Sequence, residues 1–118
     1  MKKISILLPY KENFSPMYAG AVSLLVKDIN IKSKYKKGIT VYGSTDYAEK
    51  YDIKYKNMKS KKYFFESGNI KYAENFLKLI EKHKTDLIEV HNRPATFNYL
   101  VDKLPNKKII IYFHNDPL

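Results

Sequence analysis

The sequence predicts an α/β domain built on one parallel β-sheet. Apolar residues in the 118-residue chain switch repeatedly between short strand-like runs and helical spacing, which is typical of parallel strands connected by helices. Two of the strand-like runs also end in a His-Asn pair that is soon followed by proline, which cannot continue a ladder of hydrogen bonds. In such sheets the functional loops follow the carboxyl ends of the strands. The length suits one domain, with five strands and three helices.

The first part of the chain is predicted to form a strand, a long loop, a helix and a second strand. Ile4–Leu8 is a short apolar run, and a polar loop with two prolines follows it. Ile39–Tyr42 is the second strand, closed by the turn-forming residues 43–46. Between them, one set of apolar residues recurs at helical spacing: Val22, Leu25, Val26 and Ile29.

The middle of the chain is less regular. Tyr63–Phe65 is predicted to be the third strand. The lysine-rich stretch Tyr47–Lys62 before it is left unassigned: its tyrosines fit a helical stripe, so it is expected to be partly helical, but they could also anchor a loop. Asn69 is a candidate N-cap for the second helix. The apolar face of that helix is predicted from four residues: Ala73, Phe76, Leu77 and Ile80.

The last part is predicted to form a strand, a helix and a strand. The fourth strand is Leu87–Val90, and the fifth strand is Ile109–Phe113. The helix between them ends at Pro105-Asn106, and its apolar residues are Phe97, Leu100, Val101 and Leu104. Right-handed crossovers favour the sheet order 3-2-1-4-5, with helices on both faces and a ligand crevice between strands 1 and 4. Since no helix follows the apolar fifth strand, we expect residues 1–118 to be the N-terminal part of a longer protein, truncated after strand 5.

The formal net charge of +10 leaves three interpretations open. They are a basic surface with no specific partner, attraction to an anionic membrane or glycolipid, and binding of nucleic acid. All but one of the 22 basic residues are lysine, and Ile, Asn and Tyr are abundant too, a composition expected from AT-rich codons. Scattered lysines argue against nucleic acid. No apolar run approaches the roughly 18 residues of a membrane-spanning helix, and the absence of cysteine favours a cytoplasmic location.

Small residues at Ala19-Gly20-Ala21 precede the first helix, where backbone N–H groups favour an anionic ligand. Alternatively, Gly20 only permits close packing of helix on sheet. Neither the dinucleotide-binding fingerprint nor the P-loop pattern is present. Glu12, in the same loop, is a weaker candidate for ligand contact.

His91 and His114 are expected to reach the same edge of the sheet. Each imidazole could hydrogen-bond to a ligand, act as a general acid or base, or cap a strand end structurally. Metal binding ranks last, because Glu89 and Asp116 are the only nearby carboxylates. His83 is expected to be a surface residue.

Arg93, the only arginine, suits bidentate contact with phosphate or carboxylate, or an ion pair with Glu89 or Asp116. Asp116 could orient His114 or accept a hydrogen bond from a sugar hydroxyl. No catalytic nucleophile stands out, because the chain has no cysteine and no Gly-x-Ser-x-Gly elbow.

Together these loops resemble a known family. The segments concerned are Ile4–Pro9, Glu12, Pro16, Ala19–Ala21, Ile88–Pro94 and Ile111–Asp116. They are similar to the N-terminal domain of family 4 glycosyltransferases, which have the GT-B architecture. The resemblance covers essentially the whole chain, with Ala19 standing where the family often has a first glycine.

The resemblance implies retaining, metal-independent transfer of a sugar from a nucleotide-sugar donor, with no cofactor, in a cleft between two Rossmann-like domains. This chain would supply the acceptor side, while the donor-binding domain is absent. Ala19 and Gly20 would lie near the donor phosphate and sugar, His114 would contact the donor sugar, and the His91 loop would line the acceptor cleft. The catalytic candidates are therefore His114 and Asp116, and the substrate-binding candidates are Glu12, Ala19, Gly20, His91, Asn92, Arg93 and Asn115.

The expected partners are a nucleotide-sugar and a cell-envelope glycan or glycolipid, with peripheral contact to anionic lipid at the inner face of the membrane. The alternative is a non-catalytic sugar- or nucleotide-binding module of the same fold, since a fold does not determine a function.

Overall fold

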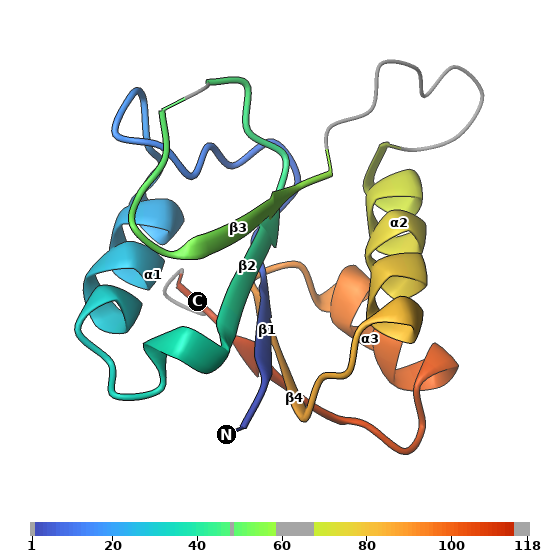
Figure 1. Ribbon diagram of the computed structural model, residues 1–118. Helices are drawn as coiled ribbons and strands as arrows, with labels where there is room; N and C mark the ends of the chain where they lie inside the picture. The colour runs from blue at the N-terminus through green and yellow to red at the C-terminus, as the bar shows by residue number, and fades with distance from the viewer. Residues whose placement is uncertain (1, 48, 59–67, 115–118) are drawn as a thin grey trace.

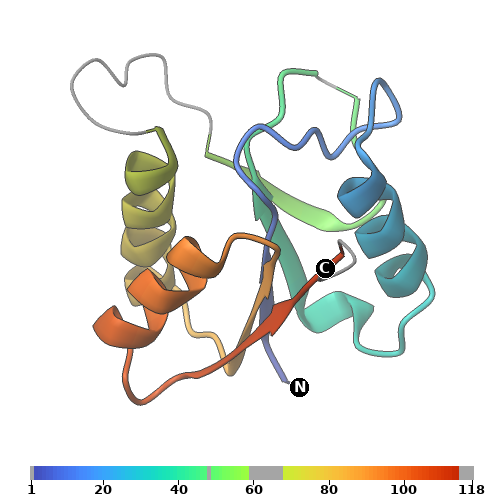
Figure 2. The ribbon, with the colours of Figure 1, turned by 180° about the vertical axis from the view of Figure 1, so that it is seen from behind.

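The computed structural model describes residues 2–47, 49–58 and 68–114, which form an α/β domain with one five-stranded parallel sheet. The strand order is β3-β2-β1-β4-β5, as predicted. Helix α1 lies on one side of the sheet, and α2 and α3 lie on the other (Figures 1 and 2). The elements are β1 (Ile4–Leu7), α1 (Ala21–Ile31), the 3-10 helix η1 (Lys36–Gly38), β2 (Ile39–Gly43), β3 (Lys54–Asn57), α2 (Gly68–Lys82), β4 (Leu87–His91), α3 (Pro94–Lys103) and β5 (Lys108–Tyr112).

Alternation of side chains along the strands divides the hydrophobic residues into two cores. In and just after β1, Ile6 and Leu8 belong to the core under α1, whereas Leu7 belongs to the core under α2 and α3. The core under α1 contains no residue of β4 or β5. The α1 side of these two strands therefore lacks an apolar cover among the described residues, and the candidate site lies there.

The third strand differs from the prediction. It is formed by Lys54–Asn57, within the stretch that was expected to be partly helical, and the predicted strand Tyr63–Phe65 lies outside the described residues. β3 pairs only with β2, so it is an edge strand. Lys54 and Lys56 are exposed and only Tyr55 packs against the core, which explains why the sequence shows no apolar run there.

The other four strands match their predicted ranges to within one residue at each end, and the three helices contain the predicted apolar repeats except for Leu104, which is the C-cap of α3. The predicted buried face of α1 was partly wrong. Val22 and Val26 of α1 are buried, but Leu25 and Ile29 are 42% and 61% exposed. A helix that covers only one part of a sheet buries a narrower stripe than a fully enclosed helix.

Helix starts determine where several candidate residues lie. α1 begins at Ala21 with Gly20 as its N-cap, and α3 begins at Pro94, directly after Arg93. Proline is favoured there because the first turn needs no N–H donor from it. Helix α2 begins at Gly68, so Asn69 lies inside the helix and the expected N-cap was wrong. None of the helices in the described ranges has the length and hydrophobicity required to cross a bilayer.

Candidate functional site

The candidate site lies at the carboxyl edge of β1, β4 and β5. In the parallel register Leu7 pairs with Val90, and His91 pairs with Tyr112. Since the three strands end at one edge, the loops that follow them meet there. Figure 2 shows the chain after β5 leaving the sheet on this side, close to α1.

Two histidines from neighbouring strands contact each other at this edge. His91 is buried, with 6% of its surface exposed, and its Nδ1 lies 2.6 Å from Nε2 of His114. Such a distance requires a hydrogen bond, so one nitrogen carries a proton and the other accepts it. Tyr112 stacks on the His91 ring, with the centroids 5.1 Å apart and the planes 15° apart. The two predicted site histidines therefore form one unit.

The Glu89 carboxylate favours a proton on one of the two ring nitrogens of His91. Its Oε2 lies 3.8 Å from Nε2 of His91, a buried nitrogen that has no hydrogen-bond partner among the described residues. A carboxylate at this distance favours a proton on Nε2 over a lone pair. In the neutral ring Nδ1 is then the acceptor, and Nε2–H of His114 donates to it. This leaves Nδ1 of His114 as a hydrogen-bond acceptor with no partner among the described residues.

The surroundings of His114 disfavour its charged form. Burial, followed by the neighbouring His91, lowers the pKa of His114 below its ordinary value of 6.5, and Glu12 partly opposes the shift. Burial also raises the pKa of Tyr112, and the carboxylate of Glu89 adds to that effect. The His114 ring is therefore favoured in its neutral form at neutral pH.

This lowered pKa predicts how stability depends on pH. A histidine whose folded pKa lies below its unfolded value contributes stability above about pH 6.5, which is lost as pH falls toward the folded pKa. Urea unfolding at a series of pH values between 7 and 5 should show falling stability, and His114→Gln should reduce the slope. An unchanged slope in the variant would show that His114 does not titrate in this way.

Asn92 connects the ends of β4 and β5. Its backbone N–H donates to the Tyr112 carbonyl at 2.7 Å, and its Oδ1 accepts the N–H of His114 at 2.9 Å. The residue adopts a left-handed conformation, with φ of 55°, which asparagine tolerates well. The side-chain oxygen of this predicted substrate-binding residue thus holds His114 in position.

Glu12 reaches the N-terminus of α1. Its Oε2 accepts the backbone N–H of Ser23 at 3.4 Å, a long hydrogen bond to an otherwise unpaired donor of the first turn. A Cβ added at Gly20 would overlap the Glu12 carboxylate, so the glycine is needed for the close approach of that group. The place predicted for an anionic ligand is thus held by the chain's own carboxylate. The side-chain Oγ of Ser23, whose backbone N–H bonds Glu12, is buried and has no hydrogen-bond partner among the described residues.

Gly20→Ala should therefore move Glu12 without unfolding the chain. The new Cβ would displace the end of a flexible side chain, so we expect a loss of about 0.5–1 kcal/mol from the weakened cap. Because Glu12 raises the pKa of His114, the displacement should also lower that pKa further. Histidine-detected NMR titration measures the pKa, and Ala21→Gly, one residue further on, is the control. An unchanged pKa in Gly20→Ala would contradict this role of Glu12.

Four other residues were predicted to belong to the site, and the structure shows no ligand-directed contact for the two of them that it describes. Ala19 is half-buried beside the N-cap of α1. Arg93 is exposed, with φ of 61°, and forms no ion pair with any described residue, including Glu89. Asn115 and Asp116 lie outside the described residues, so their predicted roles stay predictions. Within the described part, no group of three potential metal-ligating side chains is present.

The sequence placed Glu89 near His91, because residues two apart on a strand share a face. Two other contacts were not foreseen: the hydrogen bond from the His114 N–H to the Asn92 side chain, and the stacking of Tyr112 on His91. Both depend on the register of β4 against β5, which the sequence alone does not fix.

Comparison of the chain with protein-family models, with curated proteins and with solved structures gave no significant match.

Proposed function

We propose that the chain is the N-terminal, acceptor-side domain of a retaining glycosyltransferase that uses a nucleotide-sugar donor. The observation that carries the proposal is the His91–His114 pair, which lies at the carboxyl edge together with Glu12 and the N-terminus of α1. This is the edge where the resemblance expects the transferred sugar. The sequence motifs of three separate loops thus support one site.

The chemistry of the site suits sugar hydroxyls. Neutral imidazoles donate and accept single hydrogen bonds, and Nδ1 of His114 is left as an acceptor for a ligand hydroxyl. The Glu12 carboxylate can accept a second one. A polyol can hydrogen-bond to both the imidazoles and the carboxylate, because each of its hydroxyls can donate and accept. A phosphate would be repelled by the negative charge of Glu12. On this proposal the donor diphosphate is held by a second domain.

The proposal extends to the acceptor and the location. A cell-envelope glycan or glycolipid would occupy the cleft beside His91, and the reaction would take place in the cytoplasm or at the inner face of the membrane. The net charge of +10 supports attraction to anionic lipid there.

One observation favours the alternative of a non-catalytic sugar-binding module. Because Glu12 occupies the helix N-terminus, the site recognises a sugar without needing a phosphate beside it. At the His91–His114 pair, a module of this kind would bind the hexose about equally well with or without an attached nucleotide.

Sequencing the source DNA past the codon for Leu118 separates the two functions. The transferase proposal expects an open frame encoding a second Rossmann-like domain of about 200 residues with paired glutamates that hold the donor. A stop codon at that point would contradict the transferase proposal and favour the module.

A further inference from the structure

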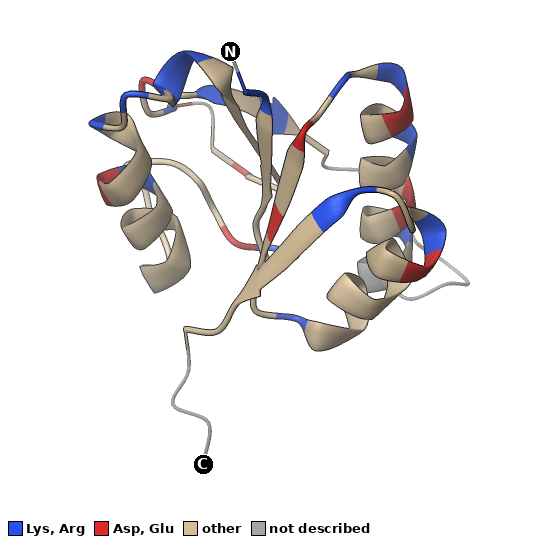
Figure 3. Ribbon diagram, turned by 90° about the horizontal axis from the view of Figure 1, so that it is seen from below, with Lys and Arg blue, Asp and Glu red and all other residues tan. Residues whose placement is uncertain are grey.

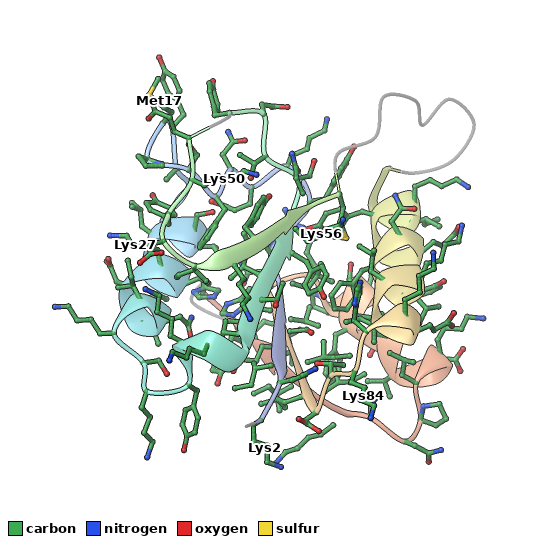
Figure 4. All side chains as sticks on the ribbon, in the orientation of Figure 1. Lys2, Met17, Lys27, Lys50, Lys56 and Lys84 are labelled. Atoms are coloured by element: carbon green, nitrogen blue, oxygen red, sulfur yellow. The ribbon has the colours of Figure 1, made fainter. Side chains whose placement is uncertain are left out.

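A cavity of about 420 Å³ lies on the α2 side of the sheet, away from the histidine site. It opens beside β3, which contributes no residue to the core under α2 and α3. Five lysines line the cavity: Lys3, Lys37, Lys54, Lys56 and Lys84. They come from four parts of the chain, namely the N-terminal segment, η1, β3 and the loop after α2. Figure 4 shows Lys56 and Lys84 on this side of the sheet.

The register of the strands explains why lysines gather here. Ser5, Thr40 and Lys54 pair in one row across β1, β2 and β3. Lys56 lies two residues further along β3, so it shares the face of Lys54. Two hydroxyl-bearing residues thus line the cavity together with the five lysines. Figure 3, which views the end at which the strands begin, shows basic segments beside the N-terminus and on the elements around it.

The positive charge of the cavity is not neutralised within the described residues. No aspartate or glutamate is among the described residues that line it. Lys54 Nζ donates to the Lys37 carbonyl at 2.9 Å, which satisfies one donor and leaves its charge unpaired. The ammonium groups of Lys3, Lys56 and Lys84 have no partner in the described part of the chain. Asp86 and Asp52, the carboxylates nearest in sequence, do not line the cavity; Asp86 accepts the backbone N–H of Lys3, and Asp52 accepts from Nζ of Lys36.

We propose that this cavity binds a small ligand with two closely spaced phosphate groups. Like charges held around one hollow repel one another, and a multivalent anion removes that repulsion while accepting hydrogen bonds from several ammonium groups. A volume of about 420 Å³ lies within the usual range for small-molecule sites. The inference goes beyond the proposed function and does not depend on it, because none of its residues belongs to the histidine site.

The test titrates the chain with inorganic pyrophosphate by isothermal calorimetry, at about 20 mM and about 200 mM NaCl. We expect binding that weakens at least about fivefold at the higher salt, since the lysines are exposed and screened. The variant Lys56→Gln/Lys84→Gln should weaken binding at least about tenfold. The matched control Lys32→Gln/Lys78→Gln removes two exposed lysines elsewhere and should change binding less than about twofold.

A second experiment, binding of the chain to lipid vesicles, shows whether the phosphates belong to a soluble ligand or to a lipid headgroup. Pyrophosphate binding with no excess affinity for vesicles assigns the cavity to a soluble diphosphate. Lysine-dependent binding to phosphatidylcholine vesicles that contain a phosphoinositide bisphosphate, but not to plain vesicles, assigns it to a lipid headgroup. The inference is overturned if neither probe binds, or if both double variants weaken binding equally, which would show a response to net charge alone. Tight binding of a single-stranded oligonucleotide that pyrophosphate cannot displace would also overturn it.

Discussion

Replacing His114 with alanine is expected to weaken binding of UDP-glucose by about 10- to 100-fold. A loss of affinity of this size corresponds to the loss of one or two hydrogen bonds to the ligand at a partly buried site. Two effects combine in this variant. The acceptor Nδ1 is lost, and His91 loses the donor that fixes its buried ring. Isothermal titration of the wild-type chain and the variant, both in excess inorganic pyrophosphate so that the lysine cavity is already occupied, measures the change.

Val101→Ala is the control for that experiment. It shortens an exposed side chain of α3 that lines neither the candidate site nor the lysine cavity, so UDP-glucose binding should stay within about twofold. A circular dichroism spectrum like that of the wild type shows that His114→Ala still folds. Equal affinities in the wild type and His114→Ala would remove His114 from the site.

Replacing Phe76 with alanine is expected to lower the free energy of unfolding by about 3–5 kcal/mol. Phe76 of α2 is fully buried in the core between α2, α3 and the sheet. Its ring packs edge-on against Tyr42 of β2, with centroids 5.0 Å apart and planes 84° apart. The variant loses both apolar burial and this aromatic contact, and leaves a cavity. Urea denaturation followed by circular dichroism measures the loss.

Phe113→Ala provides the comparison for Phe76→Ala. The Phe113 side chain is 61% exposed after β5, so its removal should cost less than about 1 kcal/mol. Similar losses in the two variants would mean that the core does not lie where α2 meets the sheet.

The sheet order could be predicted because four strands are apolar runs and the connections between them are long enough for right-handed crossovers. The position of β3 was not predicted, and the reason is its composition. An edge strand with Lys54 and Lys56 on its exposed face needs only Tyr55 to anchor it, so its composition resembles that of a loop. Leu25 and Ile29 were predicted to be buried but are exposed. The apolar repeat of a helix shows which residues share a face, but not how far the sheet extends beneath that face.

At the candidate site, the sequence predicted that His91 and His114 lie at one edge of the sheet, but not the hydrogen bonds that each of them makes. His91 and His114 come together because both follow neighbouring strands. Glu12 was ranked as a weak candidate, yet its carboxylate explains the glycine at position 20. The lysine cavity could not be predicted, because its members are distant in sequence and meet only through the register of β1, β2 and β3.

Saturation-transfer-difference NMR of the chain with UDP-glucose tests the central claim most directly, because it reports which part of the ligand touches the protein. Recognition by the His91–His114 pair predicts strong transfer to the hexose protons and weak transfer to the uridine protons, with the hexose signals lost in His114→Ala. Transfer confined to uridine, or hexose signals that persist in His114→Ala, would contradict a sugar-binding site at the carboxyl edge of the sheet.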